Sequence, residues 1–83
     1  MQIGVEISLY PLNADYIPPI REFIAQLNTE PRLRVLTNTM STQVFGDYDV
    51  VWPLLQAAMK RTFFTNAKAV FAMKVLGPLT EAS

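Results

Sequence analysis

The sequence predicts an α+β domain of ferredoxin-like topology, with elements in the order strand, helix, strand, strand, helix, strand. Two observations support it. Apolar and polar residues alternate near both ends of the chain, and two stretches with apolar residues at helical spacing flank a polar hairpin. Right-handed crossovers then give an antiparallel four-stranded sheet of order 4-1-3-2, with both helices on one face.

The first strand is predicted over residues 3–10, where side chains alternate between two faces. The face toward the core carries Ile3, Val5, Ile7 and Leu9, and the opposite face carries Gly4, Glu6, Ser8 and Tyr10. The first helix is predicted over residues 16–28, because its apolar residues recur three or four positions apart and Pro18 suits a first turn.

Residues 33–38 and 41–46 are predicted as the second and third strands, the latter rich in Thr, Val and Phe. The turn between them is short, so the two strands form an antiparallel hairpin. If Val44 faces the core, Gln43 and Phe45 face the opposite side of the sheet.

The second helix follows Gly46, and Asp47 or Asp49 can cap it. Its apolar stripe runs from Val50 to Phe63, and Pro53 must lie near the first turn or distort the helix. The last strand is predicted over residues 68–75, ending before Gly77 and Pro78.

Length and composition limit the possible functions. Residues 1–83 have the size of a single domain, and the 51% hydrophobic content allows a core of its own. Seven basic and seven acidic residues cancel, which argues against a nucleic-acid surface. Cysteine and histidine are absent, so thiolate and histidine zinc sites and the Ser-His-Asp triad are excluded. The acidic residues near the second helix do not suffice for a metal site, and none is expected.

No segment has the roughly 18 apolar residues of a membrane span, and no signal peptide is visible, so a cytoplasmic location without membrane partners is expected. The predicted topology leaves one sheet face without helices. That face suits a protein interface, a small polar aromatic ligand, or both.

Three segments, VEISLYPL, DYIPPIREFI and TNTMSTQVFGDYDVV, resemble the thiamine-binding, YkoF-like family over nearly the whole chain. The resemblance implies a non-catalytic protein that binds thiamine or its hydroxymethylpyrimidine half as a ligand and needs no cofactor. It also implies a homodimer or a homotetramer packed through the sheets, with the ligand near the open sheet face and the hairpin at a subunit interface.

An aminopyrimidine needs hydroxyl or amide donors, an acceptor for its amine, and an aromatic or thioether surface. Ten residues of the first strand and the hairpin offer these groups: Glu6, Ser8, Tyr10, Thr37, Asn38, Met40, Ser41, Thr42, Gln43 and Phe45. Each also has a simpler explanation. The Asn and Thr residues can serve the turn alone, and Met40 can simply fill a gap in the packing. Glu6 can pair with Lys68 or Lys74 on a neighbouring strand.

Three alternatives remain. The bare sheet could make a homo-oligomeric interaction or regulatory module without any ligand. Single-stranded RNA binding shares this topology, but the third strand has no basic residue beside its aromatic one. An enzyme is disfavoured, because no nucleophile has an evident partner and the first strand-to-helix loop lacks an arginine for phosphate.

Overall fold

The computed structural model describes residues 1–65 and 68–80. Its helices and strands follow the predicted order, with boundaries within a few residues of those expected from the sequence. The six elements are β1 (Gln2–Pro11), α1 (Ile17–Leu27), β2 (Arg34–Thr37), β3 (Thr42–Asp47), α2 (Tyr48–Thr65) and β4 (Ala69–Leu79).

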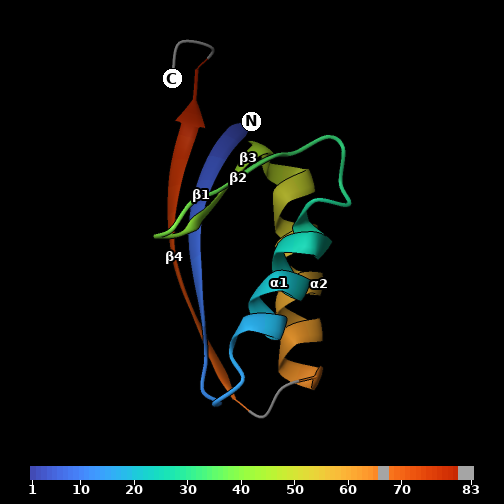
Figure 1. The fold of residues 1–83 in the computed structure, drawn as a ribbon. Coiled ribbons are helices and arrows are strands. Elements are labelled where there is room, and N and C mark those ends of the chain that lie inside the picture. Colours follow the sequence, from blue (N-terminus) through green and yellow to red (C-terminus); the bar gives the residue numbers. More distant parts are fainter. Residues whose placement is uncertain (66–67, 81–83) are drawn as a thin grey trace.

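The four strands form one antiparallel sheet in the order β2-β3-β1-β4, which confirms the predicted ferredoxin-like arrangement. Figure 1 shows α1 and α2 packed together on one side of this sheet, while the other side carries no helix. The strands differ greatly in length. The central β1 and the edge strand β4 run 10 and 11 residues, whereas β3 and β2 have only 6 and 4.

The core lies between the sheet and the two helices, and the alternation of side chains along each strand determines which of them are buried there. Ile3, Val5 and Ile7 of β1 are at most 2% exposed, as predicted, and Val44 of β3 is fully buried. The helices contribute Phe23, Leu27, Val51, Leu55 and Ala58, all at most 3% exposed. Burial of these side chains is the main favourable term for a domain of this size.

The start of α2 confirms the predicted cap. The Asp47 carboxylate accepts a hydrogen bond from the Asp49 N–H at 3.0 Å and pairs with the amino group of Met1 at 2.9 Å. These two contacts hold the pKa of Asp47 below its usual value, chiefly through the N-terminal amine. Pro53 lies inside the helix, beyond its first turn, and one backbone hydrogen bond is therefore lost there.

The predicted end of the last strand was wrong, because β4 continues through Gly77 and Pro78 to Leu79. The pairing with β1 shifts by one residue between Gly4, opposite Leu76, and Gln2, opposite Leu79. Pro78 is tolerated because β4 is an edge strand, where a missing backbone N–H leaves no strand partner unpaired. Neither helix in the described part of the chain is long and apolar enough to cross a bilayer.

Candidate functional site

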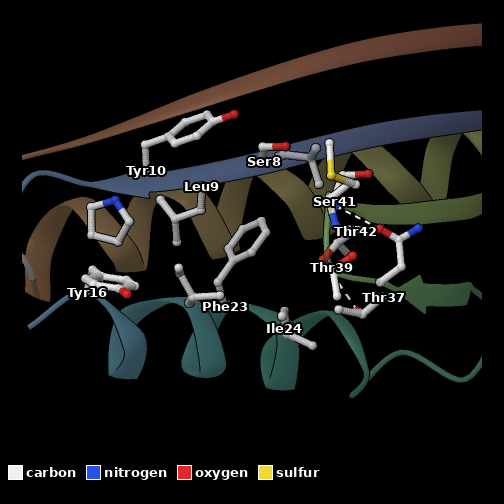
Figure 2. Close-up of a pocket in the computed structure, with 15 residues that line it drawn as sticks. Ser8, Leu9, Tyr10, Tyr16, Phe23, Ile24, Thr37, Thr39, Ser41 and Thr42 are labelled. Carbon is white, nitrogen blue, oxygen red and sulfur yellow. Dashed lines mark hydrogen bonds between the residues drawn. The ribbon is translucent and has the colours of Figure 1, made fainter.

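A cavity of about 450 Å³ opens at the end of the sheet, where β1 passes the β2–β3 hairpin and the first turns of α1. Its volume falls in the range typical of small-molecule sites. Fifteen residues line it: Ile7, Ser8, Leu9, Tyr10, Pro11, Tyr16, Ile20, Phe23, Ile24, Thr37, Asn38, Thr39, Met40, Ser41 and Thr42. Figure 2 shows these residues gathered around the space between β1, α1 and the hairpin.

The hairpin wall is held in shape by its own side chains. The Asn38 Oδ1 atom accepts hydrogen bonds from the N–H groups of Met40 and Ser41 at 2.8 and 3.0 Å, and the Asn38 N–H donates to the Ser41 carbonyl at 3.1 Å. This is the turn chemistry for which asparagine is suited. Because Oδ1 is occupied by the turn, only the amide nitrogen of Asn38 remains to serve a ligand.

Two threonine hydroxyls meet where the hairpin joins the core. The Oγ1 atoms of Thr37 and Thr42 lie 3.4 Å apart and share a hydrogen bond, and Thr42 is only 6% exposed. Thr42 alternates with buried Val44, so its side chain points to the helix side of the sheet. The Thr42 hydroxyl is therefore a fixed polar group at the wall of the cavity, available to hydrogen-bond a ligand.

The opposite wall is apolar and aromatic. In Figure 2, Leu9 and Phe23 point toward each other from β1 and α1, whereas Tyr10 lies on the far side of the strand. The Phe23 ring packs on Phe71 with centroids 5.0 Å apart, which fixes its orientation. Tyr16 stands at the rim and is 53% exposed. A flat ring could therefore rest on an apolar floor with hydroxyl groups at one edge.

None of the fifteen lining residues carries a charged side chain. Within residues 1–65 and 68–80, no group of three acidic, histidine or cysteine side chains comes close enough to hold a metal ion. The cavity thus offers neutral hydrogen bonds and an apolar surface. It offers no strong acid, base or electrophile.

Seven of the ten residues predicted for the site line this cavity: Ser8, Tyr10, Thr37, Asn38, Met40, Ser41 and Thr42. Glu6, Gln43 and Phe45 do not, because they lie on the bare sheet face further from the end of β1 where the cavity opens. The sequence did not predict the apolar residues of β1 or the residues at the start of α1 as part of the site. Phe23 and its apolar neighbours form the apolar wall, but their spacing is that of an ordinary core helix and therefore gave no sign of a site.

Phe45 has a packing role on the bare face. Its ring lies over Gly4, where an added Cβ would meet the ring at 2.9 Å, and the Arg34 guanidinium stands 4.7 Å from the ring centroid. Phe45 is therefore half-buried rather than freely exposed. Glu6 lies directly opposite Lys74 on β4, as pairing across strands requires, but no ion pair joins them in the described structure.

The same bare face exposes several apolar side chains. Leu36 is 46% exposed, Val70 48%, Tyr10 55% and Leu76 67%. Strand pairing places all four on the side away from the helices, since Leu36 is opposite Gln43, Val70 opposite Tyr10 and Leu76 opposite Gly4. An apolar surface of this kind is typical of an interaction face.

The model of the YKOF-related family matches residues 2–75, nearly the whole chain. The chain belongs to the YkoF-related family. Membership accounts for the resemblance of the three sequence segments and indicates a small-molecule binding domain. No curated protein sequence matches the chain.

Solved structures share the fold of this YkoF-related chain at low sequence identity. A hypothetical protein of Methanocaldococcus jannaschii has a TM-score of 0.82 at 22% identity, covering 96% of this chain and 84% of its own. A Streptococcus pneumoniae protein has a TM-score of 0.87 at 20% sequence identity, and the match covers 95% of this chain and 89% of that protein. A candidate thiamine biosynthesis or salvage protein from Thermotoga maritima has a TM-score of 0.81 at 13% sequence identity, and the match covers 90% of this chain and 82% of that protein. At such identities the likeness establishes the fold.

Proposed function

We propose that this chain binds thiamine or its hydroxymethylpyrimidine half in the hairpin cavity, without catalysing a reaction. The observation that carries the proposal is the cavity itself, about 450 Å³, with a neutral lining that combines an aromatic floor and a hydroxyl-rich edge. An aminopyrimidine is flat and carries two ring acceptors and one amine, which match those groups. Family membership and the thiamine-related name of the Thermotoga maritima protein support this ligand class.

The uncharged lining favours an unphosphorylated ligand. A phosphate ester carries up to two negative charges, and proteins bind it with arginine, lysine or clustered backbone N–H groups. The cavity lining includes no arginine or lysine. We therefore expect thiamine and hydroxymethylpyrimidine to bind, and thiamine monophosphate to bind more weakly than thiamine.

A second copy of the chain supplies the missing cover in this proposal. The cavity is open to solvent, and its rim carries Met40, which is 84% exposed, and Tyr16. Large apolar side chains at the mouth of a site favour closure by another surface. Homodimers or homotetramers packed through the bare sheet face would place such a surface within reach.

Isothermal titration with hydroxymethylpyrimidine, thiamine and thiamine monophosphate tests the proposal. Saturable heat with either of the first two, and weaker binding of the third, is the expected result. Absence of heat at high micromolar concentration of all three would rule out the proposed ligand class.

The competing function is a homo-oligomeric interaction or regulatory module without a small ligand. The exposed apolar side chains on the bare sheet face favour it, above all Leu76. Sedimentation velocity of the wild type and of Leu76→Lys tests this reading. An assembly that dissociates in the variant, together with no ligand binding by the wild type, would favour the module.

A further inference from the structure

The central strand β1 is longer than its neighbour on the hairpin side. It pairs with β4 from Gln2 to Pro11, but with β3 only from Gln2 to Ile7. The last four residues of β1 therefore have a strand on one side alone. The cavity touches five consecutive residues, 7–11, and since neighbouring side chains point to opposite faces, it must reach the edge of the strand.

Two hydrogen bonds establish which residues present their backbone to that edge. The Leu12 N–H donates to the Lys68 carbonyl at 2.9 Å, in register with the β1–β4 pairs. The Tyr48 N–H donates to the Met1 carbonyl at 2.8 Å, in register with the β1–β3 pairs. Antiparallel ladders alternate, so even-numbered residues of β1 bond to β4 and odd-numbered ones point toward β3.

Leu9 is the next odd-numbered residue after Ile7, which pairs with Thr42. If β3 continued, Met40 would lie opposite Leu9. The hairpin prevents this, because the Met40 N–H is held by the Asn38 side chain at 2.8 Å and the chain turns away. Within the described residues, the N–H and C=O of Leu9 thus face the cavity with no strand partner.

We infer that the backbone N–H and C=O of Leu9 form the recognition edge of the cavity and select planar heterocycles with an amine beside a ring nitrogen. The N–H donates to the ring nitrogen and the C=O accepts from the amine. This inference rests on the proposed function. It assigns the decisive polar contacts to backbone atoms of Leu9 and not to any side chain.

The reason for selectivity is the cost of leaving backbone groups unpaired. A ligand that displaces water from the Leu9 edge must replace the hydrogen bonds that water made there. A ring without the amine leaves the carbonyl unsatisfied. Of the four uncovered residues of β1, Leu9 and Pro11 face the β3 side, and Pro11 has no N–H. Leu9 therefore presents the one N–H and C=O pair at this edge, which is too short for a strand from another chain but matches the edge of a single ring.

The test combines two measurements on the full chain with hydroxymethylpyrimidine as the probe. Amide hydrogen exchange followed by NMR should show rapid exchange of the Leu9 amide without ligand and slowed exchange at saturation. The amide of Ile7, bonded to β3, and that of Ser8, bonded to β4, serve as internal controls and should be protected in both states. Titration with the analogue carrying hydrogen in place of the amine should give about tenfold weaker binding.

The outcomes separate this inference from the proposed function. If hydroxymethylpyrimidine binds while the exchange of the Leu9 amide is unchanged, or the analogue binds equally well, the Leu9 edge is not the recognition element and the proposed function stands. Slow exchange of the Leu9 amide without ligand would also overturn the inference, since another group would then occupy the edge. If nothing binds, both fail together.

Discussion

Replacing Thr42 with valine should weaken ligand binding while leaving the domain folded. The Thr42 side chain is 6% exposed, lines the cavity and shares a hydrogen bond with Thr37 at 3.4 Å. Valine has nearly the same shape, so the change removes one hydroxyl without opening a large cavity. A neutral hydrogen bond contributes about 0.5 to 1.5 kcal/mol net, which corresponds to roughly 2- to 12-fold weaker binding.

Thr62→Val is the matched control, since Thr62 is also a buried threonine, 5% exposed, but lies on α2 and does not line the cavity. Its hydroxyl donates to the Ala58 carbonyl at 3.1 Å within the helix. Titration with hydroxymethylpyrimidine measures affinity, and urea denaturation measures the free energy of unfolding. Wild-type affinity in folded Thr42→Val, or an equal loss in Thr62→Val, would refute a binding role for the Thr42 hydroxyl.

Three further changes test the packing and electrostatics. Phe23→Ala should lower the free energy of unfolding in urea by about 3–5 kcal/mol, because the side chain is 3% exposed and packs on Phe71. Trp52→Phe should change the free energy of unfolding by no more than about 1 kcal/mol. The buried indole N–H has no partner in the described structure, so removing it is favourable and offsets the loss of buried ring area. Arg32→Met should raise the pKa of Glu30 from about 2 toward its usual 4.5 in an NMR titration, because the Arg32 side chain donates to that carboxylate at 2.7 Å. The stability from this pair is present above the ordinary pKa of Glu30 and is lost as pH falls toward 2; an unchanged pKa in the variant would refute the assignment.

Most of the fold could be predicted from the sequence because its periodicities are clean. The alternation of Ile3, Val5 and Ile7 fixed one face of β1, and the short turn after Thr37 required a hairpin. The end of β4 could not be predicted. Glycine followed by proline usually ends a strand, and only the shifted pairing with Gln2 shows that an edge strand can continue through both.

The hairpin half of the candidate site was predictable, because so many hydroxyl and amide groups in six positions exceed the needs of a turn. The helix half was not, since Phe23 and Ile24 have the spacing of any core helix. Glu6, Gln43 and Phe45 were included because the open face was expected to hold the site. The cavity instead lies at the strand end, so these three side chains belong to the surface proposed for assembly.

The position of the cavity follows from strand lengths more than from special residues. A 10-residue β1 beside a 6-residue β3 leaves part of the central strand uncovered, and the Asn38 turn fixes where that part begins. Lengthening each strand of the hairpin by two residues would place a residue of β3 opposite Leu9, where it could bond to the N–H and C=O that are otherwise free. Because both strands of the longer hairpin would keep the alternation of inward and outward side chains, the core would be preserved. The length of the hairpin therefore determines whether this fold has a recognition edge at all, and a comparison confined to side chains would overlook it.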